Sequence, residues 1–473
     1  MASLHLVTGD WRYPWRMTKE IGTLVIFGAG GDLTKRLLLP GLGQLVDSGR
    51  SGDFLLLGVG VDALSNSAWR ARVEKSFASS GATGMRAKAL AAKSEYIRAD
   101  VTEPAELEAL VEKCVGTPAF YFALPPRVTI AACEALSRIS LPDGTVFGLE
   151  KPFGTDLHSA QALNRKLVKI IPEQQIQRVD HFLGKSTVLN LLGLRFANRI
   201  LEPVWNANNI DKVDIIFDEE LALEGRAGYY DRAGALIDMI QSHLLLVMAL
   251  VAMEPPSSIG AEDLRGAMAQ VLRATNVYGG RAEESSRRAR YTAGTIKGRK
   301  LPAYVREPGV DPKNKTETLA EVVFSIDNWR WAGVPFTLRS GKALARSRKE
   351  IIITFKDVPH LPSGFAGKTG PAELRISLSP DEISLDLNIN GEGDPFTIDR
   401  VVLSTEFAAG ELKPYGEVLS GLLANDPTLS VRSDEIEECW RIVEPVLSAW
   451  KKNSVKLETY PAGSSGPKSW RSK

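Results

Sequence analysis

The fold is decided by two neighbouring stretches, TLVIFGAGGDLTKRLLLPGLGQLVDSG at residues 23–49 and FLLLGVGV at residues 54–61. TLVIFGA is an apolar run of strand length, and the residues from Asp32 onward have the spacing and length of a helix. FLLLGVGV is a second apolar strand. A strand, a helix and another strand in this order predict a βαβ unit, the building block of a parallel sheet.

Further along the chain, AFYFAL at residues 119–124 and TVFGLE at residues 145–150 are again apolar strands. The helical run VTIAACEALSRI at residues 128–139 separates them. Together these segments extend the parallel sheet to about Gly154. They predict a doubly wound α/β domain.

Beyond Arg178 the pattern changes. Two long helical runs, at residues 186–200 and 235–253, flank a strand at residues 212–221. Four later runs have a period near two and are separated by turn residues, at 321–327, 350–358, 373–379 and 382–389. These runs predict a second, α+β domain with a mostly antiparallel sheet. The last segment, residues 460–473, is rich in Gly, Ser and Pro, and we expect it to be irregular.

Length and composition limit the function classes. A chain of 473 residues with 44% hydrophobic residues is too long for one core and predicts two domains. The 58 basic and 57 acidic residues nearly cancel, which argues against a nucleic acid or a membrane surface as partner. Three cysteines without CxxC spacing indicate neither disulfides nor a metal site, and favour a reducing cytoplasm. We expect an irregular tail at residues 1–20, and we expect no run near the ~20 apolar residues of a membrane span.

The glycine-rich turn is the first candidate for chemistry. Gly28, Gly30 and Gly31 follow a strand and open a helix, so backbone amides and the helix dipole can bind a pyrophosphate. Position 33 is Leu33, so the turn departs from the usual GxGxxG pattern, and such a turn alone is at least as often structural. Asp62 follows the second strand, where it is either a ligand of a ribose 2′-hydroxyl or a solvated loop residue.

A second candidate site combines Lys151, which ends a predicted parallel strand, with RVDHFLGK at residues 178–185 and DMIQSH at residues 238–243. A histidine held by a carboxylate is a suitable general base for an alcohol. His243 lies in an apolar helix, where the alternative is a core histidine, and a lysine at a strand end is usually solvated. Asp238 and His243 are five residues apart and form no i,i+4 pair, so we expect Asp180 to be the partner of His243.

Several blocks of this chain resemble those of the glucose-6-phosphate 1-dehydrogenase family, between about Thr23 and Pro461. They are GAGGDLTKR at 28–36, ALPP at 123–126, EKPFG at 150–154, RVDHFLGK at 178–185, LRFANRI at 194–200, GRAGYYD at 225–231, DMIQSH at 238–243, GVPFTLRSGKAL at 333–344 and WRIVEP at 440–445. The resemblance implies a Rossmann-like α/β dinucleotide-binding domain at residues 21–177. It implies an α+β domain with a large, mainly antiparallel sheet for substrate binding and oligomerisation at residues 178–473.

The resemblance also implies an activity and a set of site residues. His243 corresponds to the base that takes the C1 hydroxyl proton of glucose 6-phosphate, and Asp180 corresponds to the carboxylate that orients it. Hydride transfer to NADP, with NAD as a second possibility, gives the 1,5-lactone in the first step of the oxidative pentose phosphate pathway. The implied substrate ligands are Lys151, His181, Lys185, Glu219, Asp238 and Lys342. The implied coenzyme ligands are Gly28, Gly30, Gly31, Asp32, Leu33, Arg36, Asp62, Pro125 and Lys151.

Some residues depart from the family pattern. Phe182 stands where Tyr is common, Ser347 where Arg or Lys is usual, and Ser379 where Gln is common. The phosphate site is therefore weakened unless Arg346 or Arg348 replaces the missing cation.

The coenzyme positions depart as well. Val59, Gly60, Val61 and Asp62 stand where NADP-using members tend to carry an Arg, which favours NAD. Arg36 matches a basic position that can also hold the 2′-phosphate, so we expect appreciable use of NAD beside NADP.

Two other classes stay open on the sequence. One is another sugar oxidoreductase, of the inositol and glucose-fructose oxidoreductase type. The other is a catalytically silent relative that binds ligand or partner subunits. The resemblance further implies a homodimer or homotetramer, and the strand pattern does not test it.

Overall fold

The computed structural model describes residues 21–391, 393–406 and 410–470, so the tail predicted at residues 1–20 lies outside the described residues. The amino-terminal sheet has seven strands in the order β19-β6-β5-β4-β1-β2-β3. Their bounds are β1 (Ile21–Phe27), β2 (Leu55–Gly60), β3 (Glu95–Arg98), β4 (Thr117–Phe122), β5 (Val146–Leu149), β6 (Ile176–Val179) and β19 (Ser430–Val431). All pairs are parallel except β19 with β6. The predicted doubly wound α/β architecture is confirmed.

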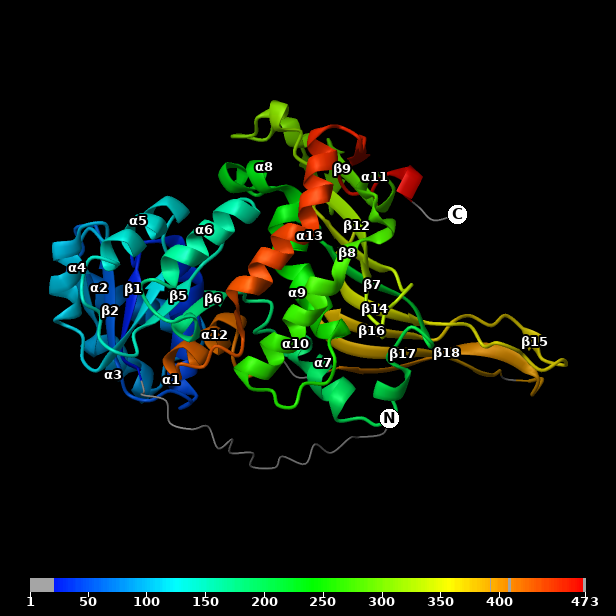
Figure 1. Cartoon of the computed structure of the whole chain (residues 1–473), viewed down its shortest axis with the longest axis horizontal. Coiled ribbons are helices and arrows are strands. Elements are labelled where there is room, and N and C mark those ends of the chain that lie inside the picture. The colour runs from blue at the N-terminus through cyan, green and yellow to red at the C-terminus, as the bar shows by residue number, and fades with distance from the viewer. Residues whose placement is uncertain (1–20, 392, 407–409, 471–473) are drawn as a thin grey trace.

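Helices pack around this sheet (Figure 1). They are α1 (Leu39–Asp47), α2 (Asn66–Ala78), α3 (Met85–Lys93), α4 (Pro104–Val111), α5 (Pro126–Leu136) and α6 (Leu157–Leu167). The helix expected from Asp32 onward begins with a π-helical turn at Thr34–Leu38, and α1 follows it directly. The strands read as continuous apolar runs because helices bury both faces of a parallel sheet.

The carboxyl-terminal part of the chain returns to this first sheet. Strand β19 pairs with β6 at its edge. Helix α12 (Pro414–Leu423) lies against α1, and Figure 1 shows its orange ribbon beside the blue one. The predicted boundary between residues 177 and 178 falls inside β6.

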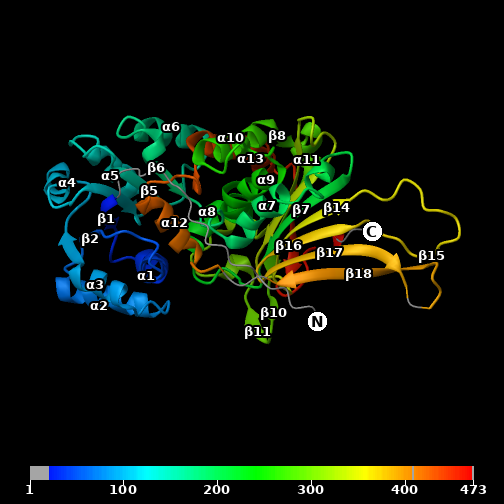
Figure 2. The same ribbon diagram turned by 90° about the horizontal axis from the view of Figure 1, so that it is seen from below.

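The second sheet has eleven strands, and the helices α7, α9 and α10 lie together beside it (Figure 2). Seven of its pairings are antiparallel and three are parallel, so the predicted mainly antiparallel sheet is confirmed. Its strands are β7 (Ile210–Asp218), β8 (Thr275–Val277), β9 (Ser286–Thr292), β12 (Leu319–Ile326), β13 (Phe336–Gly341), β14 (Arg348–Phe355), β15 (Ala366–Gly367), β16 (Glu373–Leu378), β17 (Asp381–Asn390), β18 (Thr397–Glu406) and β20 (Leu457–Pro461). The hairpin of β10 (Gly294–Ile296) and β11 (Arg299–Leu301) is separate. The remaining helices are α7 (Ser186–Phe196), α8 (Ala227–Ala235), α9 (Leu245–Ala252), α10 (Ala261–Ala274), α11 (Ala282–Ser285) and α13 (Ser433–Lys451).

One expectation about the second half of the chain was wrong, namely that it holds no long apolar run. The segment Ala227–Ala252 is long and apolar enough to span a membrane by length and composition, with a mean hydropathy of 1.9 in its most apolar window. The protein itself buries 83% of that window, so the segment is a core helix. The carboxyl-terminal stretch that we expected to be irregular is so over most of its described residues, although β20 ends at Pro461 inside it and Trp470 is buried.

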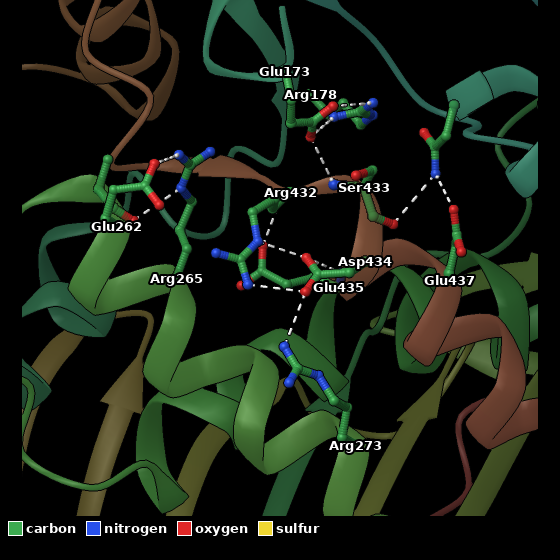
Figure 3. Close-up of polar contacts among 12 residues, drawn as sticks. Glu173, Arg178, Glu262, Arg265, Arg273, Arg432, Ser433, Asp434, Glu435 and Glu437 are labelled. Carbon is green, nitrogen blue, oxygen red and sulfur yellow. Dashed lines mark hydrogen bonds and ion pairs between the residues drawn. The ribbon is translucent and has the colours of Figure 1, made fainter. Parts of the chain in front are cut away.

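Helix α13 is tied to both domains at its first turns (Figure 3). Glu173, next to β6, accepts hydrogen bonds from Arg178 and from the backbone N–H of Ser433 at 2.9 Å. Arg273 of α10 forms an ion pair with Asp434 at 3.2 Å. The backbone N–H of Arg432 donates to the buried carboxylate of Glu435 at 2.6 Å. The contacts of Glu173 and Arg273 hold one wall of the candidate site in place, whereas the Arg432–Glu435 bond caps α13 itself.

Candidate active site

The site begins at the carboxyl ends of neighbouring parallel strands, where open α/β sheets bind ligands. Lys151 lies just after β5, and Asp180 and His181 lie just after β6. The glycine turn follows β1. Because β5 pairs with β6 in parallel, the residues that follow them meet at one edge of the sheet.

The central contact joins His243 to the two strand-end residues. His243 Nδ1 lies 2.6 Å from Asp180 Oδ1, as the sequence analysis expected. The Nζ of Lys151 is in close contact with His243 Nε2. A charged lysine can only donate hydrogen bonds, so Nε2 must be the acceptor and Nδ1 must carry the proton that bonds Asp180. This tautomer leaves Nε2 as the basic nitrogen.

Burial and neighbouring charges set the protonation of this group. Burial lowers the pKa of His243, and the charge of Lys151 lowers it further, although Asp180 opposes both. Burial alone would raise the pKa of Asp180, but the contacts with His243 and Lys151 hold it well below its usual range. Burial also lowers the pKa of Lys151. The result is a neutral imidazole next to an ionised carboxylate, which suits a general base.

The helical segment that carries His243 is unusual. Residues Leu236–Leu244 form π-helical turns between α8 and α9, in which hydrogen bonds run from i to i+5. Asp238 lies near enough for its negative charge to oppose the lowering of the pKa of both Lys151 and His243 by burial. A cavity of about 30 Å³ behind these residues is large enough for a couple of water molecules. It is lined by residues that include Lys151, Asp180, Gln241, Cys439 and Trp440.

On the other side of the imidazole lies a cationic, aromatic region. The ring of Phe182 stacks on His243 with centroids 4.0 Å apart. Lys185 Nζ lies 4.2 Å above the centre of the Phe182 ring, and Lys349 Nζ lies 4.6 Å from the centre of the Phe217 ring. Burial and the charge of Lys349 lower the pKa of Lys185 to about 8. Two cations in this position can bind a phosphate.

The arginines proposed to replace the missing cation point elsewhere. Arg348 forms an ion pair with Glu350 at 2.7 Å, and Arg346 lines a separate pocket with Arg339. Ser347 donates to the backbone carbonyl of Asp218 at 3.2 Å. The second cation near Lys185 is therefore Lys349, a residue that the sequence analysis did not select.

The remaining predicted substrate ligands also come together. Lys342 forms an ion pair with Glu219 at 2.8 Å, and Lys349 lies 3.7 Å from the same carboxylate. His181 packs edge-on against His243, with ring centroids 5.0 Å apart. Burial, followed by the charge of His243, lowers the pKa of His181 to about 3, so this imidazole is neutral at physiological pH.

The glycine turn fits a dinucleotide. Gly28 has a φ of +77°, and a Cβ at this position would lie 2.2 Å from the backbone oxygen of Ala123. Gly31 donates its N–H to the carbonyl of Gly28 at 2.9 Å, which closes the turn. At Gly30 a Cβ would lie 2.0 Å from Asp62 Oδ2, so the Asp62 carboxylate rests directly on the turn. The bare backbone and the adjacent carboxylate are the features that a pyrophosphate and a ribose require.

The other predicted coenzyme residues surround this turn less closely. Asp32 and Arg36 form an exposed ion pair with each other at 3.2 Å. Leu33 is half-buried next to them, and Pro125 is the residue that precedes α5 at the end of β4.

A cation that the sequence analysis missed lies closer to the turn. Arg72 of α2 donates to the backbone oxygen of Ala29 at 3.2 Å, and its Nη1 would lie 3.9 Å from a Cβ at Gly30.

Tyr415 was missed as well, because it comes from the distant helix α12. Its ring stacks on His181 with centroids 5.8 Å apart. The local pattern around Arg72, Lys349 and Tyr415 is that of ordinary helix and strand surfaces, so no sequence signal marks them.

A dinucleotide turn after β1 and a histidine that is held by the carboxylate after β6 of the same sheet define the class of nicotinamide-dependent oxidoreductases. Comparison with protein-family models narrows this class. Residues 25–190 match the glucose-6-phosphate dehydrogenase NAD binding domain, and residues 192–472 match the glucose-6-phosphate dehydrogenase C-terminal domain. The chain belongs to the glucose-6-phosphate dehydrogenase family and is an enzyme. Family membership also supports NADP as its coenzyme.

Individual relatives agree over nearly the whole chain. The glucose-6-phosphate 1-dehydrogenase of Treponema pallidum is 38% identical over 474 residues, which is 94% of this chain and 92% of that protein. The Zymomonas mobilis enzyme is 36% identical and covers 95% of this chain and 97% of its own length. The crystal structure of the Mycobacterium avium enzyme has a TM-score of 0.83 and 34% identity, with 96% of each chain covered. A glucose-6-phosphate dehydrogenase solved in complex with glucose 6-phosphate has a TM-score of 0.86 and 29% identity, with 95% of this chain and 96% of that one covered.

More distant oxidoreductases share the fold alone. A levoglucosan dehydrogenase solved with NADH and levoglucosan has a TM-score of 0.52 at 10% identity, and it covers 92% of this chain and 98% of its own. The alternative of a different sugar oxidoreductase therefore rests on a shared fold, whereas the family above is shown by sequence.

Lys185 gives a prediction about pH. Its lowered pKa of about 8 means that it is cationic below this pH and loses its charge above it. We expect the dissociation constant for glucose 6-phosphate, measured by isothermal titration calorimetry, to rise about tenfold between pH 7 and pH 9. Lys185→Arg stays charged over this range and should bind with much less dependence on pH. An equal rise in Lys185→Arg would show that another group causes it.

Proposed function

We propose that this enzyme oxidises glucose 6-phosphate at C1 to 6-phosphoglucono-1,5-lactone, with His243 as the general base. The observation that carries the assignment of His243 is its tautomer. Asp180 accepts from Nδ1, which leaves the Nε2 lone pair beside Lys151. A base of this kind removes a hydroxyl proton as the adjacent C–H bond breaks.

Each residue of the site has its own part in the proposed reaction. The C1 hydroxyl gives its proton to Nε2 of His243, and the carboxylate of Asp180 stabilises the imidazolium that forms. The nicotinamide supplies the hydride acceptor when it is bound, and the C1 oxygen becomes the lactone carbonyl oxygen. Lys151 donates to that oxygen and keeps it next to Nε2. Asp238 and Glu219 are placed to accept hydrogen bonds from the sugar hydroxyls.

The phosphate is held by cations on an apolar wall. Lys185 and Lys349 lie over the rings of Phe182 and Phe217, and His181 adds a neutral donor. Phe182 cannot supply the hydroxyl donor of a tyrosine, which removes one hydrogen bond to a charged group, worth about 1.5–3 kcal/mol. Lys349 replaces the cation that is missing at Ser347.

The coenzyme site combines two opposite recognition elements. Asp62 lies on the glycine turn, where its carboxylate accepts from a ribose 2′-hydroxyl and repels a 2′-phosphate. Arg72 lies beside the same turn and attracts the 2′-phosphate. We assign the NADP preference to Arg72, and we expect NAD to be used appreciably because of Asp62. Arg36 is less suited because Asp32 already neutralises it at the surface.

We propose a homodimer formed through the hairpin of β17 and β18. This hairpin carries exposed apolar side chains on one face, Ile389 at 47% and Leu403 at 56% exposure, which the strand alternation and the register place on the same side. Figure 2 shows the two strands extending away from the helices α7 and α9. An exposed apolar patch of this kind is typical of a protein interface. The three free cysteines fit a reducing compartment, which we propose to be the cytoplasm.

The base assignment predicts the behaviour of His243→Asn. Removal of the base should lower kcat with NADP by at least about a hundredfold, as is typical for loss of general base catalysis. The dissociation constant for glucose 6-phosphate should change little, because asparagine keeps a similar size and polarity. Lys185→Ala is the matched variant, and it should raise KM more than it lowers kcat. Loss of binding and turnover in equal measure in His243→Asn would make His243 a ligand instead.

The coenzyme assignment is tested by direct binding. Arg72→Ala should weaken NADP binding about tenfold or more in a fluorescence titration and leave NAD binding nearly unchanged. Asp62→Ala should instead weaken NAD binding. Arg36→Ala serves as the comparison at the other candidate position. A loss of NADP affinity confined to Arg36→Ala would assign the 2′-phosphate to Arg36.

The dimer proposal predicts the mass in solution. Light scattering after size exclusion should give about twice the chain mass of 51.6 kDa, or four times if dimers pair. Leu403→Asp should shift the protein to the monomer mass, because a charge is costly inside an apolar interface. Met85→Asp changes an apolar residue on α3 that is still more exposed, at 89%, and should not alter the mass. A Leu403→Asp protein of unchanged mass would place the interface elsewhere.

A further inference from the structure

A buried carboxylate outside the reacting groups meets the start of the helical segment that carries His243. Glu317, which precedes β12, is 7% exposed. Its Oε1 accepts the backbone N–H of Leu236 at 3.0 Å, and its own backbone oxygen accepts the N–H of Ala235 at 3.3 Å. The first amides of a helix have no partner inside the helix, so Glu317 satisfies two of them from another element.

The backbone next to this carboxylate is shaped to admit it. Gly234 breaks the helix geometry between α8 and the next segment, with a φ of +64°. A Cβ at Gly234 would lie 2.2 Å from Glu317 Oε1 and 2.6 Å from its Cδ. Any residue with a Cβ at position 234 would fill this space and displace the Glu317 carboxylate. The break in the helix at Gly234 is therefore what lets the Glu317 carboxylate reach the start of the next segment.

Keeping a carboxylate here is unfavourable in itself. Burial raises the pKa of Glu317 to about 7, even though the N–H of Leu236 and the charge of Arg288 favour its ionised form. A buried ionisable group of this kind is a cost to folding unless its partners compensate for it. An apolar residue would fill the space at a lower cost in folding free energy, but it could not accept the N–H of Leu236. The contribution specific to Glu317 is therefore the position that it gives to the start of the segment.

The same short segment also holds the loop of a proposed substrate ligand. The backbone oxygen of Thr318 accepts the N–H of Lys342 at 2.8 Å. The hydroxyl of Tyr460 donates to the backbone oxygen of Lys342 at 2.7 Å and lies 2.8 Å from the Thr318 hydroxyl. Residues 317 and 318 thus link the segment that carries His243 to the loop that carries Lys342.

We propose that Glu317 is a positioning residue, which fixes where the helical segment begins and so places His243 and Asp238 relative to Lys342. This inference rests on the proposed function, in which His243 and Asp238 act on one sugar, and on the expectation from the family resemblance that Lys342 binds the same sugar. His243 lies seven residues after Leu236, and a displacement of the first turn is carried along the segment to the imidazole. Shifts of about 1 Å at reacting groups can cost about a hundredfold in rate.

The test compares three variants of the full-length enzyme. Glu317→Ala removes the acceptor and should lower kcat at least about tenfold, with a smaller change in KM, because the base is displaced while Lys185 and Lys349 remain. Glu317→Gln keeps an oxygen that accepts the Leu236 N–H and should recover most of kcat. Glu435→Ala is the matched control, because Glu435 is also a buried carboxylate that accepts a backbone N–H at a helix start. It should lose stability without the same fall in kcat.

Hydrogen exchange measured by mass spectrometry gives a readout independent of turnover. Glu317→Ala should raise exchange in peptides covering residues 235–244, whereas Glu435→Ala should not. Unchanged exchange there, no recovery in Glu317→Gln, or an equal fall in kcat in Glu435→Ala would each overturn the proposal. A wild-type enzyme that fails to reduce either coenzyme with glucose 6-phosphate would overturn the proposed function, while the exchange data would still decide whether Glu317 fixes the segment.

Discussion

The charge of Asp180 is the constraint on which the rest of the site depends. Its side chain is fully buried, and a lone carboxylate in such a place is strongly disfavoured. Its Oδ1 is compensated by the backbone N–H of Phe182 at 2.9 Å and by His243, and the charge of Lys151 helps to keep it ionised. These partners come from the ends of β5 and β6 and from a helix of the second domain. Folding can therefore bury Asp180 as an ion only when both domains have met correctly.

The return of the carboxyl-terminal chain strengthens this dependence. Strand β19 completes the first sheet, α12 packs on α1, and α13 continues into the second domain. Because α13 lines the cavity behind Asp180 with Cys439 and Trp440, the end of the chain forms a wall of a site whose other residues come earlier in the sequence. The ion pairs and hydrogen bonds in Figure 3 hold that wall at its first turn. The backbone thus passes between the two domains three times, after β6, between β18 and α12, and from β19 into α13, in addition to the contact between Asp180 and His243.

Sequence reasoning reached the parts of this structure that depend on local pattern. Apolar runs of strand length identified the βαβ unit, and the spacing of Asp238 and His243 directed attention to Asp180. It could not find Lys349, Arg72 or Tyr415, because each reaches the site from an element whose own pattern is ordinary. The sequence pattern also failed to indicate that residues 227–252 form one long apolar helical segment, for a related reason. A helix surrounded on all sides by protein has no polar face, so it has the composition of a membrane span.

Two residues of the proposed phosphate site, Phe182 and Ser347, differ from the family pattern, and the contacts at each position explain how the difference is tolerated. The ring of Phe182 stacks on His243 and supports Lys185, and both contacts are made by the ring rather than by a hydroxyl. A phenylalanine here therefore preserves the apolar wall that buries His243 and lowers its pKa, and it lacks one donor that a tyrosine would give the proposed phosphate site. Lys349 reaches the same region from β14, two residues beyond Ser347, so the cation is moved along the strand to the same face. In the proposed site, the contacts that hold His243 and the cations for the phosphate come from different groups, so a change at one leaves the other in place.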